Sequence, residues 1–149
     1  MMTPSDSINA FFDHIRDRDA AAIATAYYPD EQLYVILEGP RLSNRGFDNI
    51  SRGWIDFCDS ALRLAGIDWT EGPYERRGTD LAWVAGVIRM RVTLRERTFE
   101  RIFRASFVLA RGVGADAGRW LIQHEHVSAA LDDPYGIGDW LKNPENDPA

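Results

Sequence analysis

The 149-residue sequence has little of what marks several common classes of protein. It contains one cysteine, Cys58, and therefore cannot form an internal disulfide. Acidic residues outnumber basic ones, 23 to 17, and a net charge of −6 argues against nucleic-acid or anionic-membrane binding, since both normally need a basic surface. No apolar run approaches membrane-spanning length, and the start lacks a basic region followed by an apolar run. We predict a cytoplasmic protein that binds neither nucleic acid nor membranes.

The chain does contain enough apolar material for one ordinary core. Hydrophobic residues make up 45% of the sequence, and five Trp, five Tyr and seven Phe supply bulky side chains. Cys58 lies in an apolar run, which favours a buried, inert thiol over a nucleophile. We predict a single domain over residues 1–131 and a polar C-terminal tail over residues 132–149.

Helical spacing comes first along the chain, and two-residue alternation follows. Ser5 or Asp6 is expected to cap a helix whose apolar positions are Ile8, Phe11, Phe12 and Ile15. Further helices are predicted over 20–27, capped by Asp19, and 47–58, with strands over 33–37, 61–69, 81–94, 98–110 and 119–128. Helices followed by strands predict an α+β fold, with the helices gathered on one face of an antiparallel sheet.

The last predicted strand carries an unusual mixture of residues. Strict alternation places Trp120, Ile122, His124, His126 and Ser128 on one face. Leu121, Gln123, Glu125 and Val127 then fall on the other. Two histidines and a serine in line with two large apolar residues indicate a strand whose apolar end packs in the core and whose polar end lines a cavity.

Three segments resemble the nuclear transport factor 2-like superfamily, which has the cystatin-like fold, and specifically its SnoaL-like branch. They are residues 80–84, 104–111 and 118–128, and the His-x-His-x-Ser ending also resembles the association domain of calcium/calmodulin-dependent protein kinase II. The resemblance implies a cone, in which a curved antiparallel sheet wraps around the N-terminal helices and leaves a pocket open at one end. It also implies a homodimer formed through the outer face of the sheet.

Enzyme roles within this superfamily transfer poorly to the sequence. The base position of the ketosteroid isomerases reads Gly39, and their oxyanion-stabilising tyrosine is matched by Phe11, which has no hydroxyl. Glu38 could replace the base only if the strand register slips by one residue. The single acid of SnoaL-type cyclases has Glu125 as its counterpart on a late strand, but Glu125 is expected to point outward if the histidines point inward.

The predicted function is the binding of a small organic molecule, with a carboxylate or a carbonyl group, in the internal pocket. An isomerase, cyclase or hydratase, with His126 or Glu38 as its base, and an oligomerisation module remain open alternatives. Arg104 could instead be paired with a carboxylate such as Glu100, and the histidines could be hydrogen-bonded in an interface. No metal or cofactor is predicted. The expected ligand-binding residues are Arg104, Ser106, His124, His126 and Ser128, with Trp83, Arg89, Tyr27, Tyr28 and Trp54 in the pocket wall.

Overall fold

A computed structural model describes residues 1–136 and 138 of the chain. The three helices are α1 (Pro4–Asp17), α2 (Ala20–Thr25) and α3 (Phe47–Asp59). α1 begins two residues earlier than predicted, because Pro4 occupies its first turn and Thr3, rather than Ser5 or Asp6, is the N-cap. The Thr3 side chain accepts from the Asp6 backbone N–H, and the Asp6 carboxylate accepts from the Thr3 N–H.

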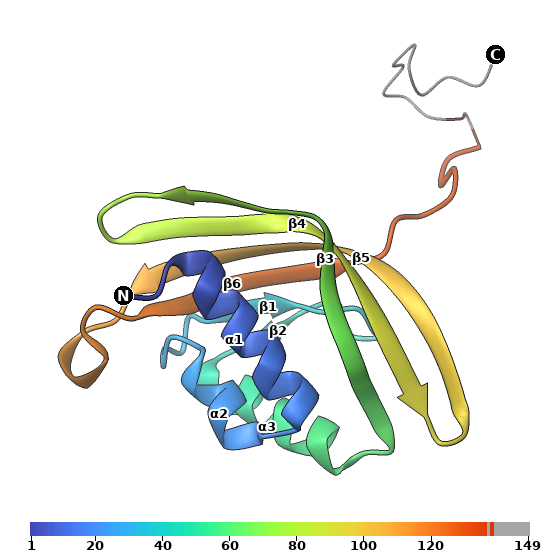
Figure 1. The fold of residues 1–149 in the computed structure, drawn as a ribbon, viewed down its shortest axis with the longest axis horizontal. Coiled ribbons are helices and arrows are strands. Elements are labelled where there is room, and N and C mark those ends of the chain that lie inside the picture. Colours follow the sequence, from blue (N-terminus) through green and yellow to red (C-terminus); the bar gives the residue numbers. More distant parts are fainter. Residues whose placement is uncertain (137, 139–149) are drawn as a thin grey trace.

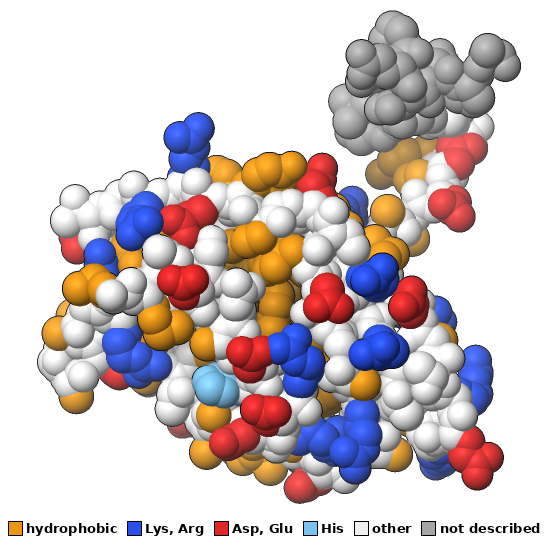
Figure 2. Space-filling view, in the orientation of Figure 1, with side chains coloured by type: hydrophobic (Ala, Val, Ile, Leu, Met, Phe, Trp, Pro, Cys, Tyr) orange, Lys and Arg blue, Asp and Glu red, His pale blue; other side chains and the backbone are white. Residues whose placement is uncertain are grey.

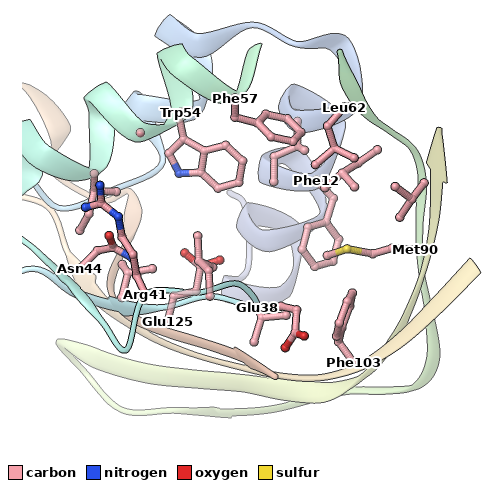
Figure 3. A pocket seen from close by; sticks show the side chains of 18 of the residues that line it. Phe12, Glu38, Arg41, Asn44, Trp54, Phe57, Leu62, Met90, Phe103 and Glu125 are labelled. Carbon is pink, nitrogen blue, oxygen red and sulfur yellow. The ribbon is translucent and has the colours of Figure 1, made fainter. Parts of the chain in front are cut away.

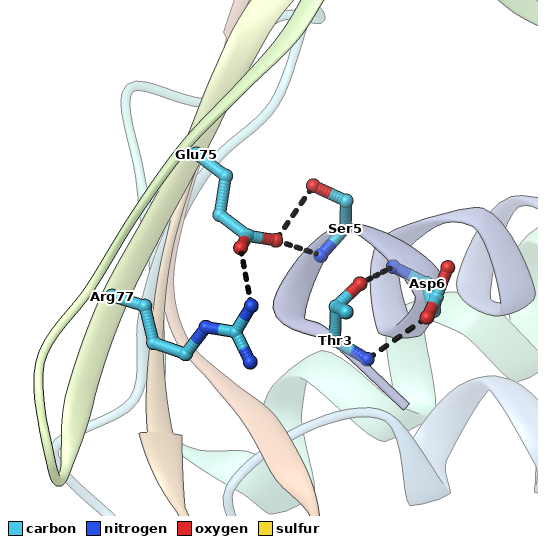
Figure 4. A network of polar contacts seen from close by, with 5 residues as sticks. All are labelled: Thr3, Ser5, Asp6, Glu75 and Arg77. Carbon is cyan, nitrogen blue, oxygen red and sulfur yellow. Dashed lines mark hydrogen bonds and ion pairs between the residues drawn. The ribbon is translucent and has the colours of Figure 1, made fainter. Parts of the chain in front are cut away.

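The N-terminus of α1 is fastened to the sheet through Glu75 (Figure 4). One oxygen of the Glu75 carboxylate accepts from both the backbone N–H and the hydroxyl of Ser5, each at 2.8 Å, and the other oxygen is 3.2 Å from Arg77. Partial burial acts to raise the pKa of Glu75, but the Ser5 hydrogen bonds and the Arg77 charge outweigh it and lower that pKa. The contact attaches the first turn of α1 to the strand that carries Glu75.

Six strands form one sheet in the order β2-β1-β6-β5-β4-β3. Its pairs are antiparallel except β1 with β6, which run parallel. The predicted strand over 61–69 continues to Arg77, through register shifts that interrupt its alternation. The strands are β1 (Tyr34–Ile36), β2 (Asn44–Arg45), β3 (Leu62–Arg77), β4 (Leu81–Leu94), β5 (Arg97–Arg111) and β6 (Trp120–Ser128), with a 3-10 turn at Gly114–Asp116 before β6.

The sheet curves around the helices, as Figure 1 shows, and the core fills the concave side. β3, β4 and β5 bend along their length, while α1 lies across the hollow that they make. The inward residues of β4 are those that its alternation predicts, including Val84, Ile88 and Val92. Val84 and Ile88 meet Ile8 and Phe11 of α1 in one cluster of buried residues. The predicted α+β cone is confirmed.

A β-bulge divides β6 into two parts. Ile122 pairs with Leu109 of β5 and His124 pairs with Val108, so that Gln123 is an extra residue in the ladder. Trp120 and Ile122 face the core before the bulge, as predicted. After the bulge the faces are exchanged, and Glu125 and Val127 point inward instead of the histidines. The predicted strict alternation of this strand therefore fails at Gln123, and every later residue lies on the opposite face from the one predicted.

The rest of the molecule adds little to the site. Within residues 1–136 and 138, no helix has the length and apolar character needed to cross a membrane. Charged side chains of both signs are interspersed on the face seen in Figure 2, with hydrophobic ones between them. Of the predicted tail over 132–149, residues 137 and 139–149 lie outside the described residues.

Candidate functional site

A cavity of about 830 Å³ lies between the helices and the concave face of the sheet. Its apolar part is built by α1, α3 and strands β3 to β5, and includes Phe12, Phe57, Leu62, Met90 and Phe103 (Figure 3). These side chains come from five different elements, and each is on the inward face of its element. The space is large enough for a small organic molecule with a mainly apolar body.

Several polar groups of the cavity lie on the other side of the space (Figure 3). Glu125 and Trp54 lie there with Arg41 and Asn44, and Glu38 lies between them and Phe103. Among these, Glu125 is the deepest, since only 2% of its surface is exposed. The cavity thus combines an apolar half with a half that carries a few hydrogen-bonding groups, which is the usual composition of a small-molecule site.

Glu125 is held by a chain of hydrogen bonds through Tyr27 to Trp54. The Tyr27 hydroxyl donates to Glu125 Oε1 at 2.6 Å, and the Trp54 indole N–H donates to the Tyr27 oxygen at 3.0 Å. Burial raises the pKa of Glu125 to about 7, although the Tyr27 hydrogen bond lowers it in part. Burial and the neighbouring Glu125 raise the pKa of Tyr27 well above its usual value, so the phenol stays a donor.

The two carboxylate oxygens of Glu125 lie in different surroundings, beside the hydrogen-bonded and tightly packed Tyr27 and Trp54. Phe11 meets both Tyr27 and Trp54 edge to face, at centroid distances of 5.4 and 5.9 Å. Oε1 is occupied by the phenol, whereas Oε2 has no hydrogen-bond partner within the described part of the chain. A proton on Glu125 is therefore expected on Oε2, and that oxygen is the one available to a bound molecule.

Four of the predicted ligand residues lie on the opposite side of the sheet. Arg104, Ser106, His126 and Ser128 line a hollow of about 410 Å³ on its outer face, over Gly86 and its neighbours. Arg104 donates to the Ser128 hydroxyl and to the Ala129 carbonyl, both at 3.0 Å, rather than to Glu100. Their predicted place inside the cone is corrected: the bulge at Gln123 turns His126 and Ser128 outward, and Arg104 and Ser106 alternate with inward residues of β5. Their role as ligand contacts stays a prediction, now for the outer face.

The remaining predicted residues divide between the two sides. Trp54 and Glu38 line the cavity, and Tyr27 lies behind it against Glu125. Tyr28 contributes its backbone N–H to Ile122 O and does not line the cavity. Trp83 and Arg89 alternate with inward residues of β4 and lie outside. His124 stacks on Tyr34, and its Nδ1 is 2.8 Å from the Tyr34 carbonyl oxygen.

Glu125 is the functional candidate that alternation placed on the wrong face. A glutamate flanked by two histidines gives no sign of burial, and a bulge has no reliable signature in a single sequence. Tyr27 was predicted in the pocket wall, but the contact that makes it important joins it to a residue 98 positions away. In residues 1–136 and 138, no three His, Cys, Asp or Glu side chains come together as metal ligands would.

The architecture defines a class: an α+β cone with an open mixed sheet wrapped around N-terminal helices and a cavity between them. Comparison with solved structures shows that this is the nuclear transport factor 2-like fold. No family model matches the sequence. No curated protein matches it either.

Three of the similar structures illustrate the range of proteins with this fold. A nuclear transport factor 2-like superfamily protein from Salmonella enterica is 18% identical, with a TM-score of 0.73 over 90% of this chain and 93% of that one. A protein from Xanthomonas campestris, named for the calcium/calmodulin-dependent protein kinase II association domain, is 18% identical, with a TM-score of 0.69 over 85% and 84%. A ketosteroid isomerase-like protein from Erwinia carotovora atroseptica is 13% identical, with a TM-score of 0.68 over 83% and 91%. At these identities the likeness defines the fold alone.

Proposed function

We propose that the protein binds a small, largely apolar organic molecule in the cone cavity and exchanges a proton with it at Glu125. The observation that carries this proposal is a buried carboxyl group with a pKa of about 7, bordering an apolar cavity of ligand size. At neutral pH such a group is present in comparable amounts as an acid and as a base, which is the condition for efficient proton transfer.

The chain's own groups suit a ligand with a carbonyl or a carboxylate group. Neutral Glu125 can donate from Oε2 to a carbonyl oxygen, and ionised Glu125 can remove a proton from the carbon beside it. The Tyr27 hydrogen bond holds the Glu125 carboxyl group in one orientation in both its neutral and its ionised form. Isomerisation balances with these steps alone, because the proton that Glu125 removes from one carbon is returned to another carbon of the same molecule; cyclisation and hydration share the proton transfer but also form a bond to a second carbon or to water. A single inward acid on a late strand also supports assignment to the SnoaL-like branch.

The test is exchange of α-protons in deuterated water, followed by proton NMR over a panel of small ketones, β-keto esters and hydroxy acids. Native protein is expected to catalyse exchange with a pH midpoint near 7, and Glu125→Gln is expected to abolish it. Glu38→Gln and His126→Gln are the matched controls, because both were predicted as bases. Exchange that survives in Glu125→Gln and disappears in either control contradicts the assignment of Glu125.

We further propose that the protein is a homodimer formed through the outer face of the sheet. This proposal rests on exposed apolar side chains across that face, where Trp83, Ile102 and Tyr74 are 43%, 53% and 54% exposed. Light scattering of the native chain should give twice the monomer mass, and Trp83→Glu with Ile102→Glu should give the monomer. A larger closed assembly would favour the oligomerisation module instead, and a native monomer would contradict both.

A further inference from the structure

The solvent-exposed part of the cavity wall, here called its entrance, includes three arginines from different elements. Arg41 is in the loop between β1 and β2, Arg52 is on α3 and Arg101 is on β5, and all three line the cavity while remaining exposed to solvent. In the part of the chain that the structure describes, none of the three has a carboxylate within 4.0 Å. Arg101 lies over the Phe99 ring at 4.4 Å, whereas Arg41 and Arg52 have no hydrogen-bond partner there.

The charge at this entrance differs from that of the whole chain. The sequence has a net charge of −6, yet the cavity wall near the solvent combines three arginines with two carboxylates, Glu38 and Asp56. Glu125, deeper in the cavity, adds a negative charge only in its ionised fraction. A local excess of cations over a low-dielectric, apolar cavity attracts anions from solution. Unpaired guanidinium groups also match the two-oxygen geometry of a carboxylate, as they do that of a phosphate.

We propose that the substrate of the cavity is an organic acid with a second oxygen function. This inference rests on the proton transfer proposed for Glu125. The carboxylate is bound at the entrance by Arg41 and Arg52, and the apolar body lies on Phe12, Phe57 and Phe103. The second group, a carbonyl or a hydroxyl, faces Oε2 of Glu125.

The orientation follows from the two ends of the cavity. A carboxylate placed against Glu125 would meet a buried acid, and the two negative charges would repel each other whenever Glu125 is ionised. The acid group therefore belongs at the arginines, where water completes its solvation. Arg41 lies on the same side of the cavity as Glu125 in Figure 3, so one molecule can reach both while its body extends toward Met90.

The experiment compares two probes with the same skeleton. 2-Naphthylacetate carries the carboxylate and 2-(2-naphthyl)ethanol replaces it with a neutral hydroxyl. Their affinities are measured by isothermal titration calorimetry near pH 6, where the probe acid is ionised. The native protein is expected to bind the acid at least tenfold more tightly than the alcohol. Raising the salt concentration to about 0.5 M should weaken the binding of the acid and leave the affinity for the alcohol unchanged.

Two variants locate the effect. Arg41→Gln with Arg52→Gln is expected to lose tenfold or more in affinity for the acid without changing the affinity for the alcohol. Arg45→Gln, which removes a cation from β2 near the same loop but outside the cavity, should behave as native. Equal affinity of the two probes, or an acid affinity unchanged in the double variant, would overturn the organic-acid inference and leave the proton-transfer proposal intact. If neither probe binds the native protein, the organic-acid inference fails, and α-proton exchange over the ketone panel decides the proton-transfer proposal separately.

Discussion

The Tyr27 hydroxyl donates a hydrogen bond of 2.6 Å to Glu125, 98 positions further along the chain. Tyr27 lies just after α2 and Glu125 lies on β6, so the contact joins the helical layer to the middle of the sheet. Both side chains are buried, and Trp54 satisfies the phenol oxygen from α3. The protonation of Glu125 is therefore part of the stability of the fold as well as of the proposed chemistry.

The raised pKa of Glu125 makes stability depend on pH with a definite sign. The group has a pKa of about 7 when folded against 4.5 as its ordinary value, so its neutral form is favoured by folding. Its contribution is fully present below about pH 4.5 and is lost as pH rises through about 7. The difference between the two pKa values corresponds to roughly 3 kcal/mol.

Glu125→Gln cannot ionise and should lack this dependence. Denaturant unfolding of native protein and variant between pH 4 and 8 measures it. The stability of the native protein relative to the variant should fall over the interval, which removes the effect of all other titrating groups. A constant difference between the two would contradict a raised pKa for Glu125.

Tyr27→Phe removes the donor to Oε1 and leaves the Trp54 N–H without its acceptor. We expect the pKa of Glu125 to rise further, because the Tyr27 hydrogen bond lowers it in the native protein. Loss of the buried hydrogen bonds should cost about 1–3 kcal/mol of unfolding free energy. Infrared titration of the carboxyl C=O band measures the pKa. A pKa that falls or stays constant would show that Tyr27 does not stabilise the ionised form.

Two glycines offer alanine substitutions with effects of opposite sign. A Cβ at Gly86 would overlap the backbone carbonyl oxygen of Glu71 and press on the Trp69 ring, so Gly86→Ala should destabilise by about 1–3 kcal/mol. Gly53 is within α3 and a Cβ there meets nothing within 4 Å, so Gly53→Ala should stabilise by about 0.5–1 kcal/mol. Thermal unfolding ranks the two variants. The reverse order would contradict the close approach of β3 and β4.

Arg18 joins the end of α1 to the turn after α3. Its guanidinium donates to the carbonyl oxygens of Cys58, Ser60 and Leu62. Arg18→Lys should lose about 1.5–3 kcal/mol, because a single ammonium cannot reach three carbonyls from one position as the planar fork does. Arg63→Lys, an exposed position on β3, is the control. Equal free energies of unfolding for the two variants in urea would show that the Arg18 contacts do not stabilise the protein.

The sequence predicted the fold well because its patterns are local. Apolar spacing of three and four along Ile8 to Ile15, and alternation from Val84 to Val92, report directly which side of an element is buried. The cap of α1 was misplaced by two residues because Thr3, Ser5 and Asp6 are all good capping residues, and the position of Pro4 decides between them.

The site was harder to predict, because it depends on contacts between distant segments and on one bulge. Trp54 was expected in the pocket wall, and Glu38 was a candidate base only if the strand register slipped; both line the cavity. Glu125 was expected outside, since alternation has no means of counting an extra residue in a ladder. Arg41 and Arg52 lie in a turn-rich loop and on an exposed helix face, where nothing in the local pattern indicates that a cavity opens beside them.

Because of the bulge at Gln123, the side chains that lie on each face of β6 depend on the number of residues in the strand as well as on their types. Point substitutions alter one surface at a time, but deletion of this one residue would send the histidines into the cavity and the glutamate out of it together. A single deletion therefore changes the cavity-facing and the outward-facing side chains of this strand together. Homologues that differ here by a single insertion or deletion should be compared by structural position, since an alignment by residue type would equate side chains from opposite faces.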